Sequence, residues 1–198
     1  LQILKKKILE HTINKMKKNI LFIVGSLRKE SFNKQIAHKV EEIIGDRANI
    51  SYLEYADVPF MNQDIEFPSP MPVSKMRDTV ASADGVWVFT PEYNHSYPAI
   101  IKNLFDWLSR PLVAGNYNAP LAITNKKMTI SGAGGRGAMG SREQLTNLLS
   151  FLKVALMPNN QTGIALNKEA WTEGRLILTD KQMEELSYQA TAFINYLD

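Results

Sequence analysis

Polar side chains that could bind an anion follow directly after the first apolar run of the chain. Ile20 to Val24 form that run, and its lack of alternation favours a strand covered on both faces, as in the middle of a parallel sheet. After Gly25 the chain carries Ser26, Arg28, Ser31 and Asn33. A helix beginning near Ser31 would add unpaired backbone amides and the positive end of its dipole, and a guanidinium adds charge-assisted hydrogen bonds. This stretch therefore predicts a phosphate site.

A simpler interpretation of the same loop stays open. Gly25 could only make a turn, Ser31 could only cap the helix, and Arg28 and Asn33 could be solvated, because caps of this kind are common. The loop matches neither the glycine fingerprint of dinucleotide-binding folds nor that of nucleoside-triphosphate-binding folds. If it binds a ligand, the pattern favours the phosphate of a mononucleotide held by side chains.

The composition excludes several classes of function. A chain of 198 residues that is 44% hydrophobic and 22% charged fits one globular domain. It has no cysteine, which excludes disulfides, cysteine zinc sites and thiol nucleophiles and is compatible with the reducing cytoplasm, where we expect the protein. The three histidines, His11, His38 and His95, lack the spacing of metal ligands, so no metal site is expected. No apolar run approaches the roughly 20 residues of a membrane span.

The positive charge is concentrated at the amino terminus. Residues 1–18 hold six lysines and one glutamate, so of the net charge of +3 the remainder of the chain carries −2. Because no nucleic-acid-reading module follows, we do not expect nucleic acid as a partner. Met16 leads straight into the first strand, which suggests the hypothesis that the native chain starts there. We therefore predict an N-terminal extension over residues 1–17, not necessarily native, and a single domain over 18–198.

Hydrophobic periodicity predicts strands that alternate with helices. The predicted strands are 20–24, 50–55, 85–89, 127–131 and an interrupted strand within 155–166, and the predicted helices are 31–44, 73–83, 99–109, 144–154 and 179–197. The proline-rich segment 57–72 is expected to be an irregular connection, of a length that more often carries a site or an interface than nothing. This alternation predicts a doubly wound parallel sheet with right-handed crossovers.

Three loops of unusual composition follow the carboxyl ends of predicted strands, at 25–33, 90–98 and 131–140. In an open α/β sheet these ends border one crevice, so loops far apart in sequence can converge on a single ligand. The third loop is dense in glycine, which would let the backbone approach a ligand closely. This convergence is the main functional signal in the chain.

Together these motifs resemble the NADPH-dependent FMN reductases, a family of flavodoxin-like fold that includes quinone, azo and chromate reductases. The resemblance rests on Gly25 to Asn33, on Pro91-Glu-Tyr-Asn94 followed by Pro98 and by Leu104-Phe-Asp-Trp107, and on the glycine loop at 132–140. It covers about residues 18–195. It implies an α/β fold with a five-stranded parallel sheet in the order 2-1-3-4-5, helices on both faces, and FMN in the crevice beside strands 1 and 3.

The resemblance also implies which residues bind the cofactor. The FMN phosphate would be held by Ser26, Arg28, Ser31 and Asn33, with the backbone amides of Leu27 and Phe32. The isoalloxazine ring would lie along Pro91, Glu92, Tyr93 and Asn94, mainly through main-chain groups. The other side would be closed by Ser131, Gly132, Gly134 and Gly135, although relatives often place a serine and a proline in this loop, where this chain has Gly132 and Ala133. No protein side chain is expected to act as nucleophile or to transfer a proton.

The implied activity is ping-pong hydride transfer from NADPH or NADH to bound FMN and on to a flavin, quinone, azo dye or metal-ion acceptor. A flavodoxin-like electron carrier and a non-catalytic FMN-binding regulatory protein stay open as alternatives. Tyr93, His95 and Tyr97 could line the acceptor cavity or pack under their loop, and Arg136 could meet a nucleotide phosphate or face solvent.

The resemblance further implies a homodimer or homotetramer with the active site at the subunit boundary. Tyr93 to Pro98 and the side chains of Leu104, Phe105, Trp107 and Leu108 are the candidate interface. For the helical residues, burial in the core of the subunit is the open alternative.

Overall fold

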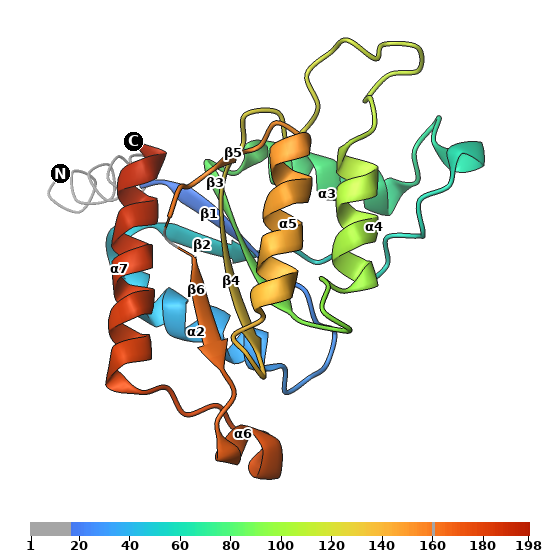
Figure 1. The fold of residues 1–198 in the computed structure, drawn as a ribbon. Coiled ribbons are helices and arrows are strands. Elements are labelled where there is room, and N and C mark those ends of the chain that lie inside the picture. Colours follow the sequence, from blue (N-terminus) through green and yellow to red (C-terminus); the bar gives the residue numbers. More distant parts are fainter. Residues whose placement is uncertain (1–16, 160) are drawn as a thin grey trace, which may run out of the picture.

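In a computed structural model of the chain, which describes residues 17–159 and 161–198, a parallel sheet lies between two layers of helices (Figure 1). The strands are β1 (Asn19–Val24), β2 (Asn49–Tyr52), β3 (Gly85–Pro91), β4 (Lys127–Gly134), β5 (Ala155–Leu156) and β6 (Thr162–Ala165). The helices are α2 (Phe32–Ile44), α3 (Met71–Ser82), α4 (Ala99–Leu108), α5 (Met139–Phe151), α6 (Lys168–Glu173) and α7 (Asp180–Leu197). Apart from Lys17, the extension expected at residues 1–17 lies outside the described residues.

The order of the strands is β2-β1-β3-β4-β5, and all of these neighbours pair in parallel. The predicted interrupted strand is present as two pieces, β5 and β6, which pair with the beginning and the end of β4. This confirms the predicted flavodoxin-like order. No helix in the described part of the chain is long and apolar enough to cross a membrane.

Both faces of the sheet are buried, which explains the unbroken apolar runs in the sequence. On β1, Leu21 and Ile23 point to the face covered by α3, α4 and α5, whereas Ile20 and Phe22 point to the face covered by α2 and α7. β3 alternates in the same way. Because successive side chains of a strand point to opposite faces, a strand covered on both sides needs apolar residues at every position.

The apolar side chains of α4 belong to the core of the subunit. Leu104, Phe105, Trp107 and Leu108 are each at most 1% exposed. The interpretation of these four residues as an interface is therefore wrong, and the core interpretation is confirmed. Aromatic residues at helical spacing favour either burial or an interface, and only the packing of α4 onto the sheet decides between them.

The predicted irregular connection is present and is tied to α4 at several points. Asn103 accepts a hydrogen bond from the Met61 amide at 2.7 Å and donates one to the Pro59 carbonyl at 2.9 Å. The Trp107 indole also donates to the Pro59 carbonyl, at 2.7 Å. The prolines of this segment therefore do not leave it loose against the sheet.

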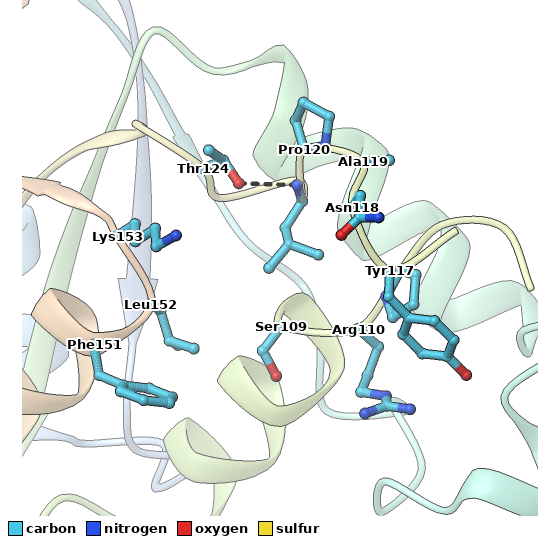
Figure 2. Close-up of a pocket in the computed structure, with 12 residues that line it drawn as sticks. Ser109, Arg110, Tyr117, Asn118, Ala119, Pro120, Thr124, Phe151, Leu152 and Lys153 are labelled. Atoms are coloured by element: carbon cyan, nitrogen blue, oxygen red, sulfur yellow. Dashed lines mark hydrogen bonds between the residues drawn. The ribbon is translucent and has the colours of Figure 1, made fainter. Parts of the chain in front are cut away.

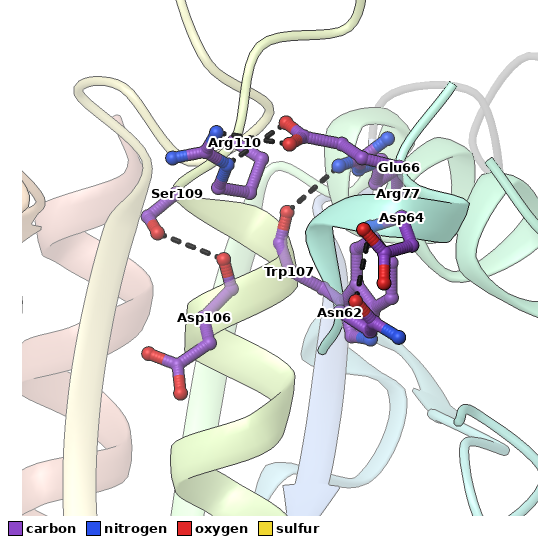
Figure 3. Close-up of polar contacts among 8 residues, drawn as sticks. All are labelled: Asn62, Asp64, Glu66, Arg77, Asp106, Trp107, Ser109 and Arg110. Atoms are coloured by element: carbon purple, nitrogen blue, oxygen red, sulfur yellow. Dashed lines mark hydrogen bonds and ion pairs between the residues drawn. The ribbon is translucent and has the colours of Figure 1, made fainter. Parts of the chain in front are cut away.

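A partly buried ion pair fastens the later part of this connection (Figure 3). Glu66 accepts two hydrogen bonds from Arg110, at 2.8 and 2.9 Å. Arg77 lies beside the pair and donates to the Trp107 carbonyl at 3.0 Å. Burial lowers the pKa of the Arg77 guanidinium, and the Glu66 carboxylate opposes that shift. Because Glu66 is buried, its charge depends on this bidentate partner.

The glycine-rich loop is shorter than the sequence predicted. β4 continues to Gly134, and α5 begins at Met139 instead of Gln144. The reversal is made by residues 135–138, with Gly137 and Ala138 in the left-handed region at φ of 66° and 51°. Glycine content made 132–140 look like one loop, whereas strand pairing with β3 and β6 extends the strand into it.

Most of these glycines make room for the protein itself and not for a ligand. A Cβ at Gly132 would lie 2.7 Å from the Thr90 carbonyl oxygen and 2.8 Å from the Ala138 Cβ, and a Cβ at Gly140 would lie 2.9 Å from the His95 carbonyl oxygen. At Gly135, in contrast, a Cβ would meet nothing within 4 Å. Gly135 therefore leaves space into which a ligand could approach the backbone, whereas the space beside Gly132 is filled by the protein.

We expect Gly132→Ala to lower the free energy of unfolding by about 1–3 kcal/mol, because the added methyl group overpacks the junction of β3, β4 and α5. Gly135→Ala is the matched control, with an expected change within about 0.5 kcal/mol. Urea denaturation followed by circular dichroism measures both. Equal stability of the two variants would show that the residues around Gly132 can accommodate the added methyl group.

Candidate functional site

A cavity of about 340 Å³ lies at the carboxyl ends of the strands, where the three loops of unusual composition meet. It is lined by Ser26, Arg28, Ser31, Phe32, Asn33, Pro91, Glu92, Tyr93, Ala133, Gly134, Gly135, Leu166 and Trp171. The loops after β1, β3 and β4 all contribute, as expected for the crevice of a doubly wound sheet. Ten of the fourteen residues predicted for the cofactor are therefore brought together.

The start of α2 offers unpaired hydrogen-bond donors to this cavity. The backbone amides of Phe32 and Asn33 have no acceptor within the described residues, whereas the Lys34 amide is capped by the Ser31 hydroxyl at 3.4 Å. Ser31 thus does act as the helix cap, as the simpler interpretation held. Because the cap satisfies one amide only, the first turn of α2 can still bind an anion.

Arg28 brings an uncompensated positive charge to the same end of the cavity. Its guanidinium lies 4.5 Å from the centroid of the Phe32 ring and donates to the Glu30 carbonyl. No carboxylate pairs with it among the residues that the structure describes. A stacked guanidinium with free N–H groups is well suited to a phosphate.

Asn33 connects the phosphate loop to the end of β4. Its side-chain oxygen accepts a hydrogen bond from the Ala133 amide at 3.0 Å, and the residue is only 2% exposed. Its side-chain nitrogen has no acceptor within the described part of the chain. Asn33 can therefore hold the two loops together and still donate toward the cavity.

Glu92 turns toward the start of α5 rather than toward solvent. One carboxylate oxygen accepts from the Ser141 amide at 3.3 Å, and the other lies 3.5 Å from the His95 imidazole. Arg142, also on α5, donates to the carbonyls of Gly137 and Gln161. Burial lowers the pKa of the Arg142 guanidinium, and the carboxylates of Glu143 and Glu92 oppose that shift. Glu92 thus supports the loop, and its main chain remains for a ligand.

A tight turn follows Glu92 and is held in place from α5. Tyr93 and Ser96 exchange backbone hydrogen bonds at 2.9 and 3.0 Å, and Asn94 and His95 between them have positive φ values of 52° and 62°. Gln144 donates to the His95 carbonyl at 2.7 Å. The turn is therefore built at a fixed position, with the Tyr93 side chain half-exposed at the cavity.

Four of the predicted cofactor residues do not line the cavity: Leu27, Asn94, Ser131 and Gly132. Leu27 and Asn94 are exposed beside it. The Ser131 hydroxyl is used inside the core, where it accepts from the Trp87 indole at 3.0 Å and donates to Gln189 at 2.9 Å. Because β4 is a regular strand at this point, Ser131 and Gly132 face neighbouring elements, and we leave both out of the site.

Sequence reasoning missed one wall of the cavity, which is formed by Ala133, Leu166 and Trp171. Trp171 lies on α6, a short helix with Asn167 as N-cap and Gly174 after its end. These two residues are the usual helix boundary signals, so the helix could have been predicted. The place of the helix could not be predicted, because it depends on two hydrogen bonds with Gln35 on α2. Gln35 donates to the Gly174 carbonyl and accepts from the Leu176 amide.

A larger cavity, of about 590 Å³, lies at the opposite edge of the sheet (Figure 2). It is bordered by the carboxyl ends of α4 and α5, where the helix dipoles are negative. Arg110 at its border is already paired with Glu66. The donor set at the start of α2 fits a phosphate, and this second cavity does not.

The chain is similar to known proteins over most of its length. The family model of the NADPH-dependent FMN reductases matches residues 18–168. A quinone reductase of Escherichia coli K12 is 31% identical over 188 residues, which cover 91% of this chain and 96% of the relative. A 2-hydroxy-1,4-benzoquinone reductase of a Burkholderia species is 32% identical over 139 residues, which cover 70% of this chain and 73% of the relative.

A solved structure is similar over nearly the same range. FerB, a flavoenzyme NAD(P)H:(acceptor) oxidoreductase from Paracoccus denitrificans, matches with a TM-score of 0.79 and 28% identity, covering 91% of this chain and 97% of that one. The enzyme interpretation is thereby supported over that of an electron carrier or a regulatory protein. Because the family match runs from β1 into α6 and the fold agrees with it, the chain belongs to the NADPH-dependent FMN reductase family and is an FMN-dependent NAD(P)H oxidoreductase.

Proposed function

We propose that this protein is a quinone reductase that holds FMN in the cavity at the carboxyl ends of β1, β3 and β4. The observation that carries the proposal is the set of unpaired donors at the start of α2, which are the amides of Phe32 and Asn33 and the free charge of Arg28. Such a set binds a phosphate dianion through charge-assisted hydrogen bonds. Quinones are proposed as acceptors because the relatives named above reduce them.

The chain's own residues bind and orient in this proposal. Ser26, Arg28 and the first turn of α2 hold the phosphate, and the main chain of 91–93 with Gly134 and Gly135 borders the ring. Trp171 borders one side of the cavity. When bound, FMN supplies hydride exchange, from NAD(P)H and then to the acceptor in ping-pong order. No side chain is assigned a proton-transferring role.

Reduction of the bound flavin by NADPH tests the function directly. In a stopped-flow experiment under nitrogen, the flavin absorbance near 450 nm should bleach within seconds and return when a quinone is added, because the family chemistry runs in two half-reactions. Flavin that stays oxidised with both NADPH and NADH for minutes would contradict the proposal and would favour an electron carrier.

Arg28→Ala should weaken FMN binding by about 1.5–3 kcal/mol, the range for hydrogen bonds to a charged group. Titration of flavin-free protein, followed by quenching of FMN fluorescence, measures this. Lys39→Ala is the control. This substitution also removes one positive charge, but Lys39 lies on the outer face of α2, where it pairs with Glu42. If both variants bind FMN as tightly as the wild type, Arg28 does not contact the phosphate.

The assembly and location of the protein are part of the same proposal. We propose a homodimer, or a homotetramer built from it, in the cytoplasm, where NAD(P)H is available. Side chains of Leu112, Val113, Tyr117 and Phe151 are 53–82% exposed around the second cavity, and apolar patches of this kind are covered in assemblies. Residues 18–198 would form the domain of each subunit. Light scattering of the purified protein checks the assembly, and a monomer at 100 μM would exclude it.

A further inference from the structure

We propose that Arg136 and His95 form a subsite for a negatively charged oxygen of the electron acceptor. The protein would then prefer acceptors that carry an ionised hydroxyl group, such as hydroxyquinones, over neutral quinones of the same size. The inference deepens the proposed function and rests on it. It concerns the rim of the flavin cavity, at two residues whose role the sequence left open.

Arg136 stands next to the cavity with its charge unused. It follows Gly135, which lines the cavity, and its side chain is exposed. A guanidinium nitrogen lies 3.5 Å from the His95 imidazole nitrogen Nδ1, and no carboxylate pairs with Arg136 within the described residues. An exposed arginine without an acidic partner can accept a ligand without first giving up an ion pair.

His95 is fixed at this position by the fold. It has a left-handed backbone conformation, and Gln144 on α5 binds both its carbonyl and the Ser96 hydroxyl, at 2.7 Å each. Gly140 permits this approach, because a Cβ there would lie 2.9 Å from the His95 carbonyl oxygen. The fold therefore sets the backbone of His95, and its imidazole, which is 74% exposed, lies beside Arg136.

The neighbouring carboxylate does not cancel the charge of Arg136. Glu92 lies 3.5 Å from the His95 imidazole, but it accepts from the Ser141 amide at the start of α5 and lies close enough to Arg142 to shift the pKa of that guanidinium. Its negative charge is thus already offset by the helix terminus and Arg142. The rim keeps a positive potential, which favours an anion.

This potential suits the chemistry of quinone reduction. One hydride and one solvent proton convert a quinone to a hydroquinone, and negative charge develops on the carbonyl oxygen when the hydride arrives first. A guanidinium beside that oxygen stabilises the charge. An acceptor that already carries an ionised hydroxyl group gains the same contact before reduction. The subsite therefore predicts tighter binding of the anionic acceptor.

Two naphthoquinones of similar shape separate charge from size. At pH 7, 2-hydroxy-1,4-naphthoquinone is an anion and 1,4-naphthoquinone is neutral. Their dissociation constants are measured on the FMN-loaded, oxidised protein without NADPH, and kcat/KM is measured separately for each. Wild type is compared with Arg136→Gln, and with Lys181→Gln as a control that removes one positive charge from an exposed site on α7.

Arg136→Gln should weaken binding of the anion about five- to tenfold and change binding of the neutral quinone less than twofold. Lys181→Gln should leave both unchanged. Equal effects of Arg136→Gln on the binding of the two quinones, or no effect on either, would overturn the subsite. It would also be overturned if Arg136→Gln raised the KM for NADPH but not the KM for NADH. A wild-type protein that binds no FMN would overturn the proposed function as well, so the two failures are distinguishable.

Discussion

The hydrogen bond from the Ala133 amide to the side chain of Asn33 is the contact on which the site depends. It joins the first turn of α2, where the phosphate donors lie, to the end of β4, where the ring would be bordered. Parallel strands bring these two segments to the same edge of the sheet, but their spacing is set by this one buried bond. If it were lost, the amide of Ala133 would be buried without a partner and the two ends of the cavity could separate.

Glutamine side chains fasten the loops around this edge to the helices. Gln35 on α2 holds the turn after α6, Gln144 on α5 holds the turn after β3, and Gln189 on α7 binds β4 and β6. In each case both the amide nitrogen and the amide oxygen are used. A glutamine can donate and accept at once without a charge, so it can fix a loop near a charged ligand without changing the local potential.

The two ends of the molecule differ in electrostatics as well as in shape. The carboxyl edge of the sheet presents the amino terminus of α2, the free charge of Arg28 and the rim around Arg136. The opposite edge presents the carboxyl ends of α4 and α5, and its Arg110 is paired with Glu66. The larger cavity at that edge therefore does not compete for an anionic cofactor, although it is roomier. The position of a flavin follows from the direction of the helices, since every helix of a βαβ unit points its amino terminus to the same edge.

The sequence by itself determined the alternation of strands and helices and the loops that meet at the carboxyl edge, because apolar runs and helix caps are local signals. The strand order was implied by the resemblance to the family. It also indicated Ser26, Arg28 and the start of α2 as a phosphate site, although a turn with a helix cap stayed open as the simpler interpretation. Only the tertiary structure decided that Ser131 and Gly132 face the core, that Leu104 and Trp107 are buried within one subunit, and that Trp171 forms a wall of the cavity. Each of these depends on which element packs against the residue, and contacts between segments far apart in the chain leave no trace in local composition.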